Sequence, residues 1–150
     1  MEPTKIEALL AAIYGPAVGA HTARRLMENL TAYQAAHPPR VGVPFAQQDA
    51  IVITYGDQFQ KDGEPALGTL GRFFEEHLRG LISGVHILPF FPYTSDDGFS
   101  VQDYRAIQPA WGSWEDIHAI AGRFRLMLDL VINHCSQQHA WFQAFLRDEA

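Results

Sequence analysis

A chain of 150 residues with 47% hydrophobic and 12% aromatic residues can form one ordinary domain with a core. Its formal net charge of -6 argues against nucleic acid as a partner, because nucleic-acid binding needs clustered basic side chains. No apolar run is long enough to span a bilayer and the N-terminus lacks the features of a signal peptide, so we expect a cytoplasmic protein without a membrane partner. Cys135 is the single cysteine, which excludes an internal disulfide.

The N-terminal third predicts two helices and a linker. Apolar residues at helical spacing predict one helix over residues 6–14, which Gly15-Pro16 should end, and another from about 20 to 33. We therefore expect residues 1–48 to form a helical hairpin and linker, apart from residues 49–150. The apolar stripe of the first helix is Ile6, Leu9, Leu10, Ile13 and Tyr14, and that of the second is Ala23, Leu26, Met27, Leu30 and Tyr33.

From residue 49 onward, strand and helix patterns alternate. Strands are expected at 50–55, from 85 and at 126–132. Helices are expected at about 67–81, at 113–124 and from His139 to the end. Ser113 and Asp116 form a near variant of the capping box at the start of the second of these helices, and Trp141, Phe142 and Phe145 of the last should point inward. Three strands, each followed by a helix, predict an α/β fold with parallel pairing, either half of an open sheet or part of a barrel.

The carboxyl ends of the second and third strands are the expected place of function, because ligands gather there in α/β folds. The second strand leads into a long loop with Asp96-Asp97-Gly98 among aromatic residues, and the third into Asn133-His134. Aromatic faces beside carboxylates suit a sugar. The alternatives are an ordinary Asp-Gly turn and a structural histidine.

Other motifs point away from metal and nucleotide sites. Asp129, an acid within an apolar strand, should be hydrogen-bonded or paired and structural in role. The spacing of His134 and His139 does not suit a metal site, and the chain has neither a glycine-rich phosphate loop nor a G-x-S-x-G elbow. A nucleotide-binding domain is therefore disfavoured.

Several segments together resemble one family. They are V-H-I-L-P-F-F-P at 85–92, S-D-D-G-F at 95–99, Asp103-Tyr104, W-G-S-W-E-D-I at 111–117 and D-L-V-I-N-H at 129–134. This combination resembles the sucrose phosphorylase branch of the α-amylase superfamily, glycoside hydrolase family 13. The N-terminal helices resemble the extension of its glucosylglycerate phosphorylase group.

The resemblance implies a fold and a reaction. The fold is a partial (β/α)8 TIM barrel, with its first three βα units in residues 49–150, preceded by the N-terminal helical hairpin. The reaction is retaining transfer of a glucosyl unit to inorganic phosphate, which gives α-glucose 1-phosphate without any cofactor. Glucosylglycerate is the preferred substrate, and the alternatives are a sucrose phosphorylase, an amylase-type α-glucosidase or a non-catalytic sugar-binding module.

The resemblance also implies roles for individual residues. Asp96 would accept hydrogen bonds from the glucosyl hydroxyls, Phe99 would pack against the sugar, and His134 would bind its primary hydroxyl. Asn133 is not assigned to a metal. The family's catalytic carboxylates follow barrel strands four, five and seven and a whole barrel takes about 250 residues, so we expect no catalytic residue in this chain and no activity of the chain alone. An incomplete barrel should also leave one apolar sheet face uncovered.

Overall fold

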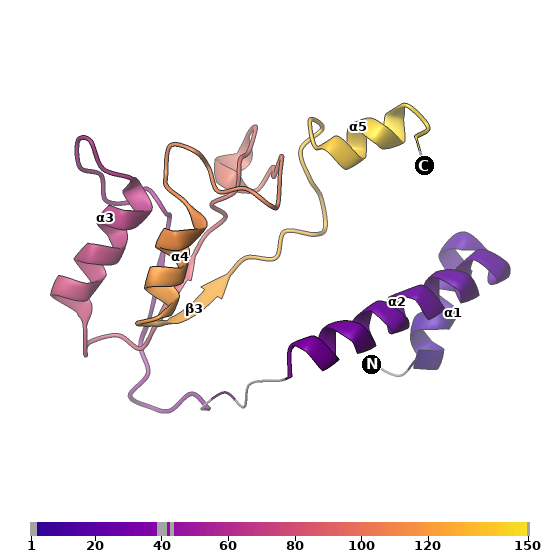
Figure 1. The fold of residues 1–150 in the computed structure, drawn as a ribbon, viewed down its shortest axis with the longest axis horizontal. Helices are drawn as coiled ribbons and strands as arrows, with labels where there is room; N and C mark the ends of the chain where they lie inside the picture. The colour runs from indigo at the N-terminus through magenta and orange to yellow at the C-terminus, as the bar shows by residue number, and fades with distance from the viewer. Residues whose placement is uncertain (1–2, 39–41, 43, 150) are drawn as a thin grey trace. The chain divides into compact units, whose positions relative to one another are not determined.

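The computed structural model describes residues 3–38, 42 and 44–149 (Figure 1). The contacts between residues divide the chain into two units, residues 1–44 and residues 45–150. Each unit is described by itself.

The first unit consists of helices α1, Pro3–Tyr14, and α2, Pro16–Ala36. Gly15 separates them with a φ of 84°, a left-handed conformation that glycine adopts without steric cost. The expected start of the second helix near residue 20 is wrong, because Pro16 begins α2: the fixed φ of proline suits a first helical turn. At Gly19 the two helices pack closely, since a Cβ there would collide with the backbone of Leu10 and Ala11.

The apolar stripes of α1 and α2 are mostly uncovered. Ala23 is buried, but several of the larger side chains are exposed, among them Leu9, Ile13, Tyr14, Leu26, Leu30 and Tyr33. Two helices bury only the narrow strip along which they touch, which leaves the rest of each stripe in water.

The second unit is built on a parallel sheet of three strands in the order β1-β2-β3. The strands are β1, Ile51–Thr54, β2, Gly84–Ile87, and β3, Arg125–Leu128. The helices are α3, Ala66–Phe73, continued by the π-helical turn η1, Phe74–Leu78, then α4, Trp114–Ala121, and α5, Ala140–Leu146. The predicted parallel pairing of alternating strands and helices is confirmed.

One face of the sheet carries the core. Val85 and Ile87 of β2 are fully buried in a single cluster with side chains of α3 and α4, including Leu67, Leu70, Phe74, Ile117 and Ile120. Side chains alternate between the two faces of a strand, so the residues before and after Val85 and Ile87 along the chain point to the opposite face of the sheet.

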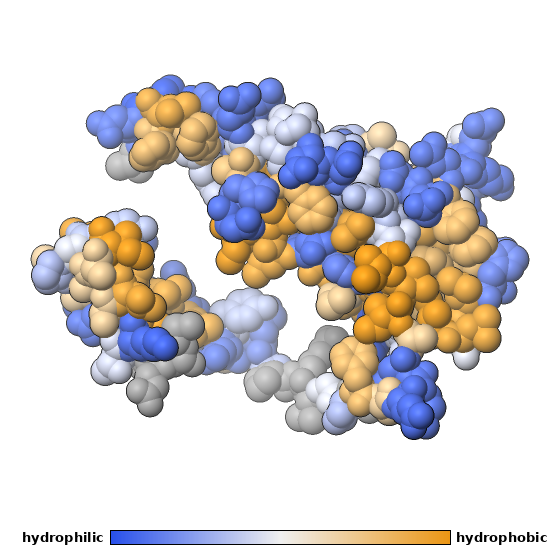
Figure 2. Space-filling model, turned by 180° about the vertical axis from the view of Figure 1, so that it is seen from behind, coloured by the Kyte–Doolittle hydropathy of each residue, from blue (hydrophilic) through white to orange (hydrophobic). Residues whose placement is uncertain are grey.

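The opposite face of the sheet is uncovered. Ile51 and Ile53 of β1 and Met127 of β3 are exposed, with Ile53 at 63%. Hydrophobic side chains are visible on the surface of both units (Figure 2).

Strand β3 ends four residues before its predicted end at Ile132. Its pairing with β2 stops at the pair Ile87 and Leu128, and two residues after Ile87 stands Pro89, which has no N–H to donate. Asp129 therefore lies just past β3 rather than in its middle, and the next apolar residues, Leu130 and Ile132, are exposed.

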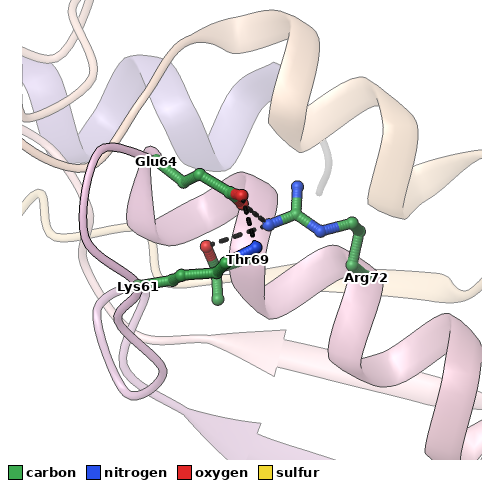
Figure 3. A network of polar contacts seen from close by, with 4 residues as sticks. All are labelled: Lys61, Glu64, Thr69 and Arg72. Atoms are coloured by element: carbon green, nitrogen blue, oxygen red, sulfur yellow. Dashed lines mark hydrogen bonds and ion pairs between the residues drawn. The ribbon is translucent and has the colours of Figure 1, made fainter.

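Polar contacts hold the helices of the core in place. The predicted capping box of α4 is confirmed, since Asp116 Oδ2 accepts a hydrogen bond from the Ser113 backbone N–H at 2.9 Å. Beside α3, Glu64 pairs with Lys61 at 2.7 Å and with Arg72, which also donates to Thr69 at 3.3 Å (Figure 3). Exposed ion pairs add little stability, about 0–1 kcal/mol each, so this network orients the loop after β1 more than it stabilises the fold.

A junction around Ser136 joins the loop after β2 to the segment after β3. Ser136 is fully buried and its Oγ lies 2.7 Å from Thr94 Oγ1. Its backbone N–H donates to Val101 O at 2.8 Å, and its Oγ accepts from the Gln138 N–H at 3.0 Å. These bonds fix two segments that leave neighbouring strands.

Helix α5 follows this junction and differs from the prediction. Its aromatic residues were expected to point inward, but Trp141, Phe142 and Phe145 are exposed. No residue of this helix is buried. Among the helices of the described residues, none is long and apolar enough to cross a membrane.

We predict that the chain of residues 1–150 by itself binds a dye specific for exposed apolar surface and shows a broad or absent thermal transition. The reason is the uncovered face of the sheet, together with unpaired outer edges on β1 and β3. Dye fluorescence and calorimetry measure the two effects. A sharp two-state melt of a monomer would contradict this prediction.

We predict that Ser136→Ala loosens the junction. The substitution removes two hydrogen bonds, one with the Thr94 hydroxyl and one with the Gln138 N–H, at a net cost of roughly 0.5–1.5 kcal/mol each. Amide hydrogen exchange over residues 94–101 and 133–138 should become about 5-fold to 100-fold faster. Ser100→Ala is the control, because the hydroxyl of the half-buried Ser100 contacts only Thr94 among the described residues, at 3.3 Å. Equal exchange in the two variants would show that Ser136 is not the anchor.

Candidate functional site

The acidic turn after β2 has an unusual backbone. The three residues of the 3-10 turn η2, Asp96–Gly98, have φ values of 60°, 47° and 100°. Gly98 is required, because a Cβ there would lie 2.7 Å from Pro89 O. At Asp96 and Asp97 a left-handed backbone costs on the order of 1–3 kcal/mol each, although aspartate tolerates it better than most residues.

This strained turn presents two free carboxylates. Asp96 and Asp97 are both exposed, and among the described residues no ion pair neutralises either of them. The backbone of the turn is closed by the Phe99 N–H, which donates to Asp96 O at 2.9 Å. Phe99 itself is half-buried and packs against the core, which ties the turn to the fold. The turn can therefore offer carboxylate acceptors to a ligand without rearranging its backbone.

His134 lies in the segment that follows β3, and its side chain is exposed. The Asn133 side-chain amide donates to His134 Nδ1 at 2.8 Å. An amide nitrogen can only donate, so Nδ1 accepts, and the proton of the neutral ring is then on Nε2. The Nε2–H of His134 is thus available as a donor.

The junction at Ser136 relates the sequence-predicted residues to one another. Asp96 follows Thr94 by two residues and His134 precedes Ser136 by two, while Thr94 and Ser136 are joined through their hydroxyls at 2.7 Å. The two loops therefore meet at the carboxyl edge of the sheet. Within the part of the chain that the structure describes, no hydrogen bond connects Asp96 to His134 directly.

Tyr104 also links the two loops. Its hydroxyl lies 2.5 Å from Val131 O and 3.1 Å from His134 O, so its one proton is shared between backbone carbonyls on either side of Asn133, with the shorter contact at Val131. Burial raises the pKa of the Tyr104 hydroxyl, with a smaller contribution from the nearby Cys135 thiol. The hydroxyl therefore stays protonated, and remains a donor, at neutral pH.

Sequence reasoning missed residues at the end of β1. Tyr55, Asp57, Tyr93, Asp97 and Trp111 line a pocket of about 220 Å³. Gly56 lets Leu67 and Trp111 pack closely beside this pocket, since a Cβ at position 56 would lie 3.0 Å from both Leu67 Cδ2 and Trp111 Cε3. The sequence does contain a signal for these residues, because Tyr55 and Asp57 come at the end of a strand pattern, as Asp96 and His134 do. No role in a site was predicted for them.

A larger hollow of about 480 Å³ lies between the loop after β2 and the start of α5. Its lining includes Asp103, Tyr104, Arg105, His139 and Trp141. His139 is buried at the N-cap of α5, where its Nδ1 accepts from the Trp141 N–H at 3.0 Å. This histidine therefore has a structural role, and it was not predicted as a site residue.

Asp129 is paired, as predicted for an acid in an apolar segment. His86 Nε2 on β2 lies 3.1 Å from Asp129 Oδ2, and both side chains are mostly buried. His86 Nδ1 is buried and has no hydrogen-bond partner among residues 3–38, 42 and 44–149. In the same ranges, no group of three or more His, Cys, Asp or Glu residues is placed to hold a metal ion.

Comparison with known proteins gives a consistent result. The model of the alpha amylase catalytic domain matches residues 73–150. A glucosylglycerate phosphorylase of Spirochaeta thermophila is 48% identical over 156 residues, which cover 99% of this chain and 27% of that protein. A second, from Allomeiothermus silvanus, is 56% identical over 105 residues, which cover 70% of this chain and 19% of that protein.

The fold comparison agrees with the sequence comparison. The crystal structure of sucrose 6F-phosphate phosphorylase from Thermoanaerobacter thermosaccharolyticum matches with a TM-score of 0.61 and 38% identity, over 69% of this chain and 20% of that one. Three parallel strands with their helices match the start of the TIM barrel in such neighbours. This chain spans about a quarter of the length of the Spirochaeta relative, 27%. With more than half of its residues matched by the family model, the chain belongs to the alpha-amylase catalytic domain family.

Proposed function

We propose that this chain is the N-terminal part of a retaining α-glucoside phosphorylase with glucosylglycerate as its preferred substrate. The observation that carries the proposal is the match over 99% of the chain to a protein named glucosylglycerate phosphorylase. That match includes residues 1–48, which we assign to an N-terminal helical extension. Residues 49–150 are then the first three βα units of the catalytic barrel.

In this proposal Asp96, Phe99 and His134 bind the glucosyl unit. The exposed carboxylate of Asp96, held by a strained turn, accepts hydrogen bonds from sugar hydroxyls. The ring of Phe99 packs against the sugar, and the Nε2–H of His134 donates to the primary hydroxyl. The hydroxyl junction between Thr94 and Ser136, at 2.7 Å, supports this assignment because it brings the two loops to one edge of the sheet.

The chemistry follows from the family. A carboxylate attacks the anomeric carbon while an acid protonates the departing glycerate oxygen, and hydrogen phosphate then displaces the carboxylate and returns a proton to the acid, which gives α-glucose 1-phosphate and the free enzyme. Both carboxylates belong to parts of the protein outside residues 1–150, so the chain alone is inactive in this proposal. The reaction uses no cofactor, with inorganic phosphate as co-substrate. A cytoplasmic location stays a prediction.

We predict that the full-length protein releases glucose 1-phosphate from glucosylglycerate only when phosphate is present, and more slowly from sucrose. The rate should be the same with and without a metal chelator. Coupled detection of glucose 1-phosphate and of free glucose separates the alternatives. Free glucose released regardless of phosphate would indicate an amylase-type hydrolase, and binding without any turnover would indicate a sugar-binding module.

We predict that Asp96→Asn lowers kcat/KM for phosphorolysis by about 10-fold to 150-fold and His134→Ala by about 2-fold to 13-fold. The first removes the charge of a hydrogen-bond acceptor, where bonds to charged groups contribute roughly 1.5–3 kcal/mol, and the second removes a neutral hydrogen bond of about 0.5–1.5 kcal/mol. Asp62→Asn and His21→Ala are matched controls at exposed positions of the loop after β1 and of α2. If the site variants keep the activity of the controls, the site assignment is wrong although the proposed function stands.

A further inference from the structure

We propose that Tyr104 is a positioning residue that holds His134 where it binds the glucosyl unit. The inference rests on the proposed function and adds to it a residue that does not itself touch the sugar. It is carried by the contacts between the Tyr104 hydroxyl and the backbone on either side of Asn133.

The segment that carries His134 has few other restraints. Strand β3 ends at Leu128, and beyond it the backbone pairs with no strand in the described residues. The hydroxyl of Tyr104 contacts Val131 O at 2.5 Å and His134 O at 3.1 Å. The next anchor along the chain is the buried Ser136. His134 therefore lies between the buried Val131 and the buried Ser136, and the Tyr104 hydroxyl is the group that contacts its own backbone carbonyl.

Tyr104 can serve as an anchor because its own ring is held. The ring packs edge-on against Phe91 with centroids 5.8 Å apart. On the other side it stacks with Trp141 at 6.1 Å and 25°, and it contacts His139 at 5.4 Å. Phe91 belongs to the loop after β2, whereas Trp141 and His139 belong to the chain beyond β3. The ring is thus wedged between the two loops, and its hydroxyl has a defined direction.

The side chain of His134 depends on this anchor because it is exposed. Asn133 is its only hydrogen-bond partner among the described residues, and Asn133 is itself exposed. A binding group has to be held within about 0.5 Å of its productive position. Packing around the imidazole does not supply that precision, so the backbone must. The hydroxyl of Tyr104 is the group that fixes the backbone at His134.

The test is Tyr104→Phe in the full-length protein, which keeps the ring and its stacking but removes the hydroxyl. Two donors are compared in the synthetic direction with glycerate as acceptor: α-glucose 1-phosphate and its 6-deoxy analogue, which lacks the primary hydroxyl assigned to His134. We expect kcat/KM for α-glucose 1-phosphate to fall by about 3-fold to 10-fold, the equivalent of one hydrogen bond. For the 6-deoxy donor we expect little change, and in a His134→Ala background no further loss.

The ratio of kcat/KM for the two donors within one variant does not depend on how much of the protein is folded. A lower melting temperature therefore cannot imitate the expected result. Tyr33→Phe is the control, since it removes the same hydroxyl from an exposed tyrosine of α2 and should leave both rates unchanged. An equal loss for both donors would show a general structural role and overturn the inference, as would no loss at all. Absence of any turnover in the unsubstituted protein would instead overturn the proposed function, and the inference with it.

Discussion

The in-register parallel pairing of β1, β2 and β3 is the constraint on which the site depends. Thr54, Ile87 and Leu128 lie side by side in the register, so the three strands end together and release their loops at the same edge. Parallel strands are buried by helices packed against them, and here α3 and α4 supply that cover on the face of Val85 and Ile87. Every polar residue assigned to the site follows one of these strand ends. A shift in the pairing register would therefore move the loops apart even if every side chain stayed the same.

Hydroxyl groups then convert this common edge into a defined site. Long loops carry many backbone groups that need partners, and these loops satisfy them with each other: Ser136 with Thr94 and Val101, and Tyr104 with Val131 and His134. Ser136 is buried and Tyr104 is half-buried, whereas Asp96, Asp97 and His134 are exposed. The anchoring and the binding functions are thus divided between neighbouring residues. Among the described residues, this division leaves the carboxylates of Asp96 and Asp97 without a side-chain partner and leaves the Nε2 of His134 unoccupied, as groups that must bind a ligand should be.

The sequence predicts the framework of this site better than its details. Uninterrupted apolar runs identify the strands, and Ser113 with Asp116 marks the start of α4, because both signals are local. The predicted end of β3 at Ile132 was wrong because the length of a strand depends on its partner strand. Here Pro89 follows β2 and has no N–H to continue the pairing. The anchors Ser136 and Tyr104 gave no local signal, since their roles depend on contacts with residues 42 and 27 to 30 positions away. The positive φ of Asp96 and Asp97 was equally hidden, although the glycine that follows them indicated a turn.

The error about α5 has a simple cause. Apolar periodicity shows which side chains are suited to burial, but it does not show what covers them. The aromatic residues of α5 were expected to point inward but are exposed. The apolar stripes of α1 and α2 are also largely exposed, and so is the second face of the sheet, which an incomplete barrel was predicted to leave open. On that sheet face, His86 and Asp129 form a mostly buried pair between exposed apolar neighbours. A paired charge among apolar residues suits the interior of a closed barrel far better than a surface in water. The chain spans 27% of the Spirochaeta relative, and in the proposed function this sheet face packs inside the rest of the barrel. The same part of the protein would complete the site at the strand ends, which links ligand binding to the stability of the sheet.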